Sequence, residues 1–142
     1  MIAAILALLQ ADTALAALLP GGIYDAAGVT VISRQTTPLA FDGNQELRPC
    51  ALLQARSARP VGGAIDASEV GLTLYFYQRA QSVQIDQARM RCYTLLHRQR
   101  IAPASGGAWA VRHAEDVLSQ FDLSLRAQLI VSRYTVPLLR RV

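Results

Sequence analysis

The hydrophobic period of the sequence changes between two neighbouring segments near its middle. From residue 69 to 77, apolar side chains alternate with other side chains, and this period of two predicts a strand. From Ser82 to about Arg100 the apolar residues follow a helical spacing, and Ser82 is a suitable N-cap. The apolar positions of this predicted helix are Ile85, Ala88, Cys92, Leu95 and Leu96. The fold must therefore contain both a strand and an amphipathic helix.

The N-terminal residues predict a helix with a break. Apolar residues recur at helical spacing from residue 2 to 9, and Asp12 stands where an N-cap would begin a second short turn, residues 13–19. Pro20-Gly21-Gly22 ends the helix, and a β-like stretch is expected from Val29 to Ile32. The opening run is apolar, but it has no basic region before it and polar residues interrupt it. We therefore interpret it as a soluble helix and not as a signal peptide or a membrane span.

Three further strands complete the predicted elements. Residues 47–56 carry apolar groups on both sides, which indicates a central strand. Residues 109–117 and 125–136 predict two strands that pair as a hairpin, with a turn at 119–122. The order of helix, strands, helix and strands favours an α+β domain. We expect a mostly antiparallel β-sheet with two helices packed on one face, and long loops that serve ring assembly.

Length and composition limit the classes of protein that fit. A chain of 142 residues is long enough for one domain with a real core. The chain is 52% hydrophobic and 17% charged, which excludes a disordered protein. With so few charges, some apolar surface is expected to contact a partner. The net charge of +4 comes entirely from arginine, because the 14 basic residues include no lysine. A genome that favours arginine and a use in interfaces both explain this bias.

No arrangement of residues predicts catalysis or metal binding. His97 and His113 lack the spacing of metal ligands, and we expect no metal. Cys50 and Cys92 predict free buried thiols, although Cys50 with a histidine is formally possible as a nucleophile. The adjacent carboxylates at 115 and 116 should point to opposite faces of a strand. No GxSxG, GxGxxG or P-loop sequence occurs, so we expect no cofactor and no enzyme.

The order of elements resembles a known family. The segments IAAILALLQADTALAALLPGGIYDA, EVGLTLYFYQ and IDQARMRCYTLLHRQRI, followed by a closing β-hairpin, resemble the tail terminator and tail-completion proteins of long-tailed bacteriophages over nearly the whole chain. The resemblance implies one tail-terminator-like domain, residues 1–142, that forms a ring with six members in the family. Such a ring stops growth of the tail tube and joins the tail to the neck or head. The expected location is the virion, after synthesis in the host cytoplasm.

The expected partners are other copies of the chain, the tail tube protein and neck or connector proteins, with no membrane. DNA could pass through the ring lumen without sequence-specific binding. The family carries over no catalytic residues, so the candidate interface residues come from this sequence alone, because arginine and aromatic residues are enriched at interfaces. They lie in or beside the long segments 33–46 and 56–68 and on one strand face: Arg34, Leu39, Phe41, Arg48, Arg56, Arg59, Tyr75 and Tyr77.

Two other functions remain open at this point. A head–tail connector or neck subunit could share the same fold and composition, and fold alone does not separate the two. A small basic nucleic-acid-binding module is permitted by the sequence pI of about 9.6, and Tyr75 and Tyr77 could stack on bases from an exposed strand face. Against this, Glu69 shares that face and Arg79 is the one cation near it.

Overall fold

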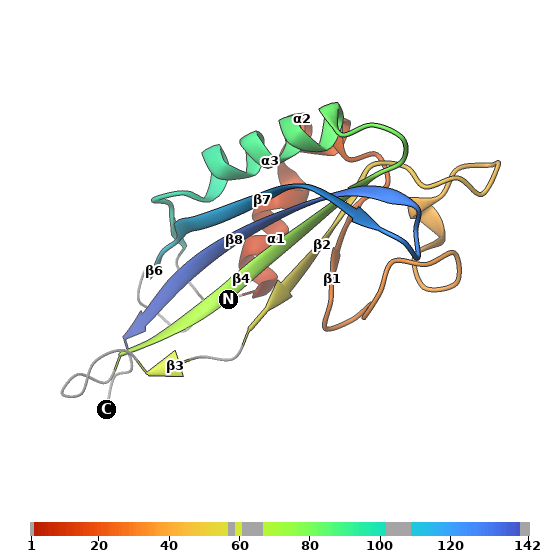
Figure 1. Ribbon diagram of the computed structural model, residues 1–142. Coiled ribbons are helices and arrows are strands. Elements are labelled where there is room, and N and C mark those ends of the chain that lie inside the picture. The colour runs from red at the N-terminus through yellow and green to blue at the C-terminus, as the bar shows by residue number, and fades with distance from the viewer. Residues whose placement is uncertain (1, 57–58, 61–66, 102–108, 140–142) are drawn as a thin grey trace.

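The computed structural model describes residues 2–56, 59–60, 67–101 and 109–139, and Figure 1 shows their arrangement. The elements in chain order are α1 (Ile2–Ala11), α2 (Thr13–Leu18), β1 (Ile23–Asp25), the 3-10 helix η1 (Pro38–Ala40), β2 (Cys50–Ala55), β3 (Arg59–Pro60), β4 (Ala67–Gln78), α3 (Val83–Leu96), β5 (Arg100–Ile101), β6 (Trp109–Ala110), β7 (Arg112–Asp122) and β8 (Ala127–Leu139). Within these ranges, no helix combines the length and the apolar character needed to cross a membrane.

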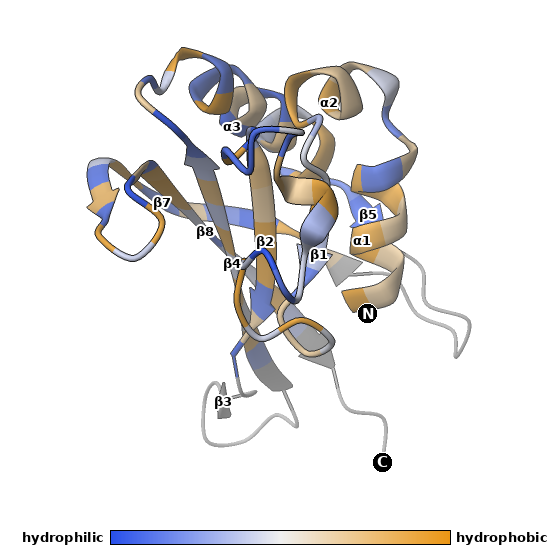
Figure 2. Cartoon of the chain, turned by 90° about the vertical axis from the view of Figure 1, so that its right-hand side faces the viewer, coloured by the Kyte–Doolittle hydropathy of each residue, from blue (hydrophilic) through white to orange (hydrophobic). Residues whose placement is uncertain are grey.

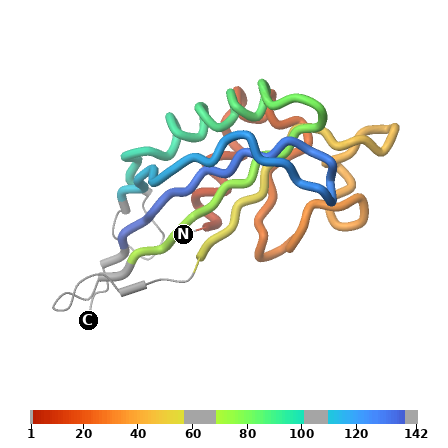
Figure 3. The backbone as a smooth tube through the Cα atoms, viewed as in Figure 1, coloured from red at the N-terminus to blue at the C-terminus, as the bar shows by residue number. Residues whose placement is uncertain are grey.

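The main sheet is mixed but mostly antiparallel. Its strand order is β1-β2-β4-β8-β7, and the short β3 pairs with β4. β1 runs parallel to β2, whereas the other pairs in this sheet are antiparallel. The predicted α+β class is therefore confirmed, and so is the central position of β2. The long strands β4 and β8 pair along their whole length. Ala67 pairs with Leu139 at one end and Gln78 pairs with Gln128 at the other, and Figure 3 traces both strands along the length of the molecule.

The larger hydrophobic core joins the three α-helices to one set of alternate strand residues. Val70, Leu72, Leu74 and Phe76 of β4 are 6% exposed or less, as the period of two predicts. Leu72, Leu74 and Phe76 pack with apolar residues of α1, α2, α3 and β8. Burying side chains of this size stabilises a fold by about 1.5–3 kcal/mol each. The helix break at Asp12 is confirmed, so the described residues contain three α-helices where two were expected.

A smaller core lies on the opposite side of the sheet. Cys50, Leu52 and Tyr77 point to this side and are covered by the segment 26–48, which contributes Ile32 and Phe41 among others. The strand predicted at residues 29–32 is wrong, because the chain turns before it reaches a neighbouring strand. The turn is held by Asp25, whose carbonyl oxygen accepts hydrogen bonds from the backbone N–H groups of Gly28 and Val29.

The β7–β8 hairpin is confirmed, but its turn was placed wrongly. β7 continues to Asp122, and the turn lies at Leu123–Arg126. The register shifts between Val117 and Gln120, and Ser119 has a positive φ of 61°. A β-bulge thus absorbs the turn-forming residue without ending the strand.

The cap of α3 also differs from the prediction. Ser82 occupies the N-cap position but makes no side-chain capping hydrogen bond. Instead, Oε1 of Gln78 accepts from the backbone N–H groups of Gln84 and Ile85, each at 3.1 Å. Gln78 is the last residue of β4, so this side chain fixes where the helix starts relative to the sheet.

Candidate functional site

The segment 26–48 is held together by its own polar side chains. Arg34 donates two hydrogen bonds to the carbonyl oxygen of Gln45, at 3.0 and 2.8 Å, and its guanidinium lies 5.1 Å from the centre of the Phe41 ring. Oδ1 of Asp42 accepts from the backbone N–H groups of Asn44 and Glu46. The guanidinium of Arg34 therefore helps to close the loop, although the side chain remains exposed.

Two predicted interface residues are buried, which corrects the sequence prediction. Phe41 and Tyr77 are each 8% exposed, because the segment 26–48 folds over the sheet and covers them in the smaller core. Tyr75, on the same strand face, is half-buried and its hydroxyl donates to Oε1 of Gln54. The two tyrosines therefore do not form an exposed stacking surface for nucleic-acid bases.

The remaining predicted interface residues lie at different places on the molecule. Leu39, in η1, is 73% exposed. Arg48 is half-buried and donates a hydrogen bond to the carbonyl oxygen of Leu39. Arg56 is exposed and its side chain lies beside Gly71 of β4. Arg59 belongs to β3, but its side chain lies outside the described residues. The structure thus brings Leu39 and Arg48 together and leaves Arg56 apart.

A cleft of about 370 Å³ adjoins Leu39 and Arg48. Its other lining residues come from α1, α2, the glycine turn and β1, and they are mostly apolar: Leu9, Gln10, Ala16, Leu19, Pro20, Gly21, Gly22, Ile23 and Tyr24. Nε of Arg48 is buried and has no hydrogen-bond partner among the described residues. None of the ion pairs found in the described ranges includes Arg48. The cleft is therefore apolar with one positive charge that lacks a carboxylate partner there.

Exposed apolar residues at the other edge of the sheet were missed by the sequence reasoning. Leu118 and Phe121 of β7 are each 51% exposed, and Leu123 in the hairpin turn is 83% exposed. The alternation of Phe121, Leu123 and Leu125 was an available signal, because it predicts that the strand continues through residue 122. Placing the turn at 119–122 concealed it.

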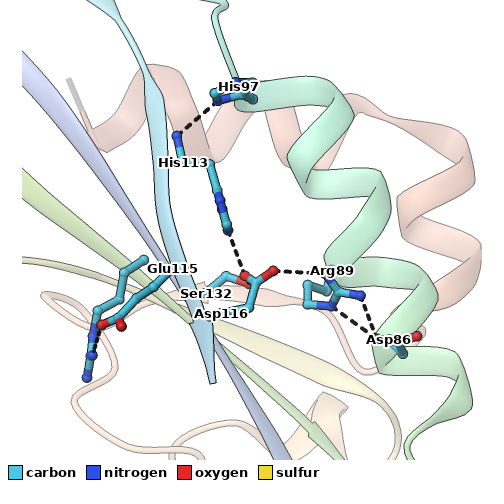
Figure 4. Close-up of polar contacts among 8 residues, drawn as sticks. Asp86, Arg89, His97, His113, Glu115, Asp116 and Ser132 are labelled. Atoms are coloured by element: carbon cyan, nitrogen blue, oxygen red, sulfur yellow. Dashed lines mark hydrogen bonds and ion pairs between the residues drawn. The ribbon is translucent and has the colours of Figure 1, made fainter. Parts of the chain in front are cut away.

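The densest polar cluster joins α3 to β7 and β8 around Asp116 (Figure 4). Oδ2 of Asp116 accepts from Arg89 at 2.8 Å, and Oδ1 accepts from Ser132 at 2.7 Å and from Nε2 of His113 at 2.9 Å. Burial raises the pKa of the Asp116 carboxyl, but the hydrogen bonds from His113, Ser132 and Arg89 outweigh burial and hold it below its ordinary value. Asp116 is therefore an ionised anchor between helix and sheet.

The cluster does not have the geometry of nucleophilic catalysis. Ser132 donates to Asp116 but is fully buried, so its hydroxyl is out of reach of a substrate. Nδ1 of His97 accepts from the backbone N–H of His113. Glu115 points away from this cluster and pairs with Arg133, so the two adjacent carboxylates diverge as predicted (Figure 4).

The cysteines and the metal ligands also offer no reactive centre in the described ranges. Cys50 and Cys92 are free and buried, as predicted, and burial raises the pKa of each thiol to about 12. A thiol with such a pKa is protonated at neutral pH and is a poor nucleophile. The described residues contain no group of three or more His, Cys, Asp or Glu side chains that could hold a metal ion.

No protein-family model matches the chain, and no curated protein matches it significantly. The candidate functional surfaces are therefore the two sites described above: the cleft beside Arg48 next to β1, and the exposed apolar residues along β7 and its hairpin turn.

Proposed function

We propose that this chain is a structural subunit of the tail of a long-tailed bacteriophage, which forms a ring that terminates the tail tube and joins the tail to the neck or head. The order of helices and strands agrees with what the resemblance of the sequence implies, which supports the assignment. A ring with six members, located in the virion, is part of the proposal.

The observation that carries the proposal is the apolar surface along α3 and β7. Val83, Met90 and Tyr93 follow one stripe of α3 and are 62, 55 and 43% exposed. Leu118, Phe121 and Leu123 continue the exposed apolar residues along β7 and its turn. Large apolar residues concentrated on adjacent elements are typical of protein–protein interfaces, and β7 is an edge strand of eleven residues.

The arginines favour this function over nucleic-acid binding. Arg79, Arg89 and Arg91 pair with carboxylates, and Arg133 pairs with Glu115. Arg34 and Arg48 donate to backbone carbonyl oxygens. A surface that binds phosphates through counterion release needs several unpaired cations side by side, which these six arginines do not provide.

The test is the assembly state of the purified chain. Analytical ultracentrifugation and negative-stain electron microscopy are expected to find a closed ring, either of the chain alone or after addition of tail tube protein. A monomer at every concentration, with no ring when tube protein is present, would contradict the proposal. Position in an assembled particle separates the terminator from a neck ring. Binding to DNA at low salt that falls steeply as salt rises would favour the nucleic-acid alternative.

A further inference from the structure

The turn of the β7–β8 hairpin forms an exposed apolar tip with one carboxylate at its base. Leu123 is 83% exposed and Phe121 is 51% exposed, while Asp122 stands between them. Oδ1 of Asp122 accepts a hydrogen bond from the backbone N–H of Leu125 at 2.9 Å. The carboxylate thus holds the turn that carries the tip, residues 121–124.

The cleft beside Arg48 has the complementary chemistry. Its walls are apolar, and Arg48 supplies a positive charge that lacks a carboxylate partner among the described residues. Its floor is firmly built, because the N–H of Gly21 donates to the carbonyl oxygen of Pro49 at 2.8 Å and the hydroxyl of Tyr24 donates to that of Gly21 at 2.6 Å. Leu39 stands exposed at the rim.

The tip and the cleft lie at opposite edges of the sheet. The tip extends from β7 and the cleft adjoins β1, which are the two ends of the strand order β1-β2-β4-β8-β7. Figure 2 shows β7 on one side of the view and α1 and α2, which line the cleft, on the other. Two different patches that fit one another give a head-to-tail contact, and repetition of such a contact generates a ring when the rotation closes.

We infer that the hairpin tip of one copy inserts into the Arg48 cleft of the next copy, with Leu123 in the apolar part and Asp122 facing Arg48. This inference rests on the proposed ring function and identifies the surfaces that would build the ring. Apolar area supplies the attraction, and the pairing of Asp122 with Arg48 orients the tip. The partner of the cleft is therefore a second copy of this chain.

The experiment uses two variants at exposed positions, so that folding is preserved. Leu123→Asp damages the tip and Leu39→Asp damages the rim of the cleft. Gln99→Asp is the control, because it adds the same charge at an exposed position beside Val111, at the end of β7 opposite the tip. Circular dichroism of all three confirms the fold, and sedimentation velocity measures association.

Each of the two contact variants alone is expected to associate at least about tenfold more weakly than the unmodified chain, because a charge enters a buried apolar contact. Gln99→Asp should assemble normally. An equimolar mixture of Leu123→Asp and Leu39→Asp should form a heterodimer and nothing larger, because only one tip and one cleft remain intact in each pair.

The outcomes separate this contact from the proposed function. A ring that persists in Leu123→Asp or Leu39→Asp overturns the contact but leaves the ring function standing. A mixture that does not pair also overturns it. A monomeric unmodified chain, with or without tube protein, overturns both. Native mass spectrometry that finds a small anionic molecule bound in place of a second copy would assign the cleft to a ligand and overturn the contact.

Discussion

Asp12 and Arg91 join the break between α1 and α2 to the middle of α3. The guanidinium of Arg91 donates to both carboxylate oxygens of Asp12, at 2.9 and 2.7 Å, across 79 residues of sequence. The same carboxylate accepts from the backbone N–H of Leu15 and so caps α2. The Asp12 side chain therefore caps the start of α2 and also holds α3 in place against it.

Substitution of Asp12 should separate these two roles. Asp12→Asn keeps a side-chain acceptor for the cap but loses the ion pair, whereas Asp12→Ala loses both. At neutral pH, melting temperatures followed by circular dichroism should therefore fall in the order unmodified chain, Asp12→Asn, Asp12→Ala. An Asp12→Asn variant that melts with the unmodified chain would show that the ion pair contributes nothing.

The same pair makes a specific pH dependence. The hydrogen bonds from Arg91 lower the pKa of Asp12 from 3.8 to about 2. Because the folded pKa is depressed, its stabilisation is fully present above about pH 4 and is lost as the pH falls through about 2. The difference in melting temperature between the unmodified chain and Asp12→Asn should shrink over this window. A difference that stays constant from pH 7 to pH 2 contradicts the assignment.

The cap of α3 predicts a contrast between two neighbouring polar residues. Gln78→Ala removes the acceptor for two backbone N–H groups and should lower the free energy of unfolding by about 1–2 kcal/mol. Ser82→Ala, at the formal N-cap, should change it by less than about 0.5 kcal/mol, because its hydroxyl makes no capping hydrogen bond. Urea unfolding measures both. The reverse order would mean that Ser82 is the cap in solution.

The bulge in β7 predicts a stabilising substitution. Ser119 has a φ of 61°, a region that costs energy for a residue with a Cβ and not for glycine. Ser119→Gly should therefore raise the free energy of unfolding by about 0.5–1 kcal/mol. Ser124→Gly is the control, since Ser124 is not among the positive-φ residues and should gain nothing. Equal effects in chemical denaturation would argue against strain at the bulge.

Adjacent carboxylates on β7 should respond differently to removal. Asp116→Ala leaves Arg89, His113 and Ser132 without their shared acceptor and should cost about 2–3 kcal/mol. Glu115→Ala breaks an exposed pair with Arg133 and should cost less than about 1 kcal/mol. The ionised Asp116 carboxylate stabilises the fold at pH values above the ordinary pKa of an aspartate. This stabilisation is lost as the pH falls through the lowered pKa of Asp116 in the folded protein. Denaturation with urea at pH 7 compares the two variants.

Much of the secondary structure could be predicted because its signals are local. The alternation in β4, the stripe of α3 and the cap at Asp12 each depend on residues close together in sequence. The prediction at residues 29–32 was wrong because an apolar run does not reveal whether a neighbouring strand is within reach. The turn at 119–122 was wrong because a bulge tolerates turn-forming residues inside a strand.

The candidate site was less predictable because exposure depends on what covers a residue. Phe41 and Tyr77 are residue types common at interfaces, but both are buried in the smaller core, where the segment 26–48 packs against the sheet. Leu123 was not singled out, although it is the most exposed of the large apolar residues described. Leu39 alone was both predicted at an interface and strongly exposed beside the cleft.

The sequence by itself determined the α+β class, the amphipathic side of α3, the helix break at Asp12 and the diverging carboxylates at 115 and 116. Each follows from a local signal: the period of a segment, the order of the segments or a capping residue. The tertiary structure decided which side chains the segment 26–48 covers, which residue caps α3, and that β1 and β7 form opposite edges. These features depend on contacts between residues far apart in the chain, and periodicity within one segment carries no information about them.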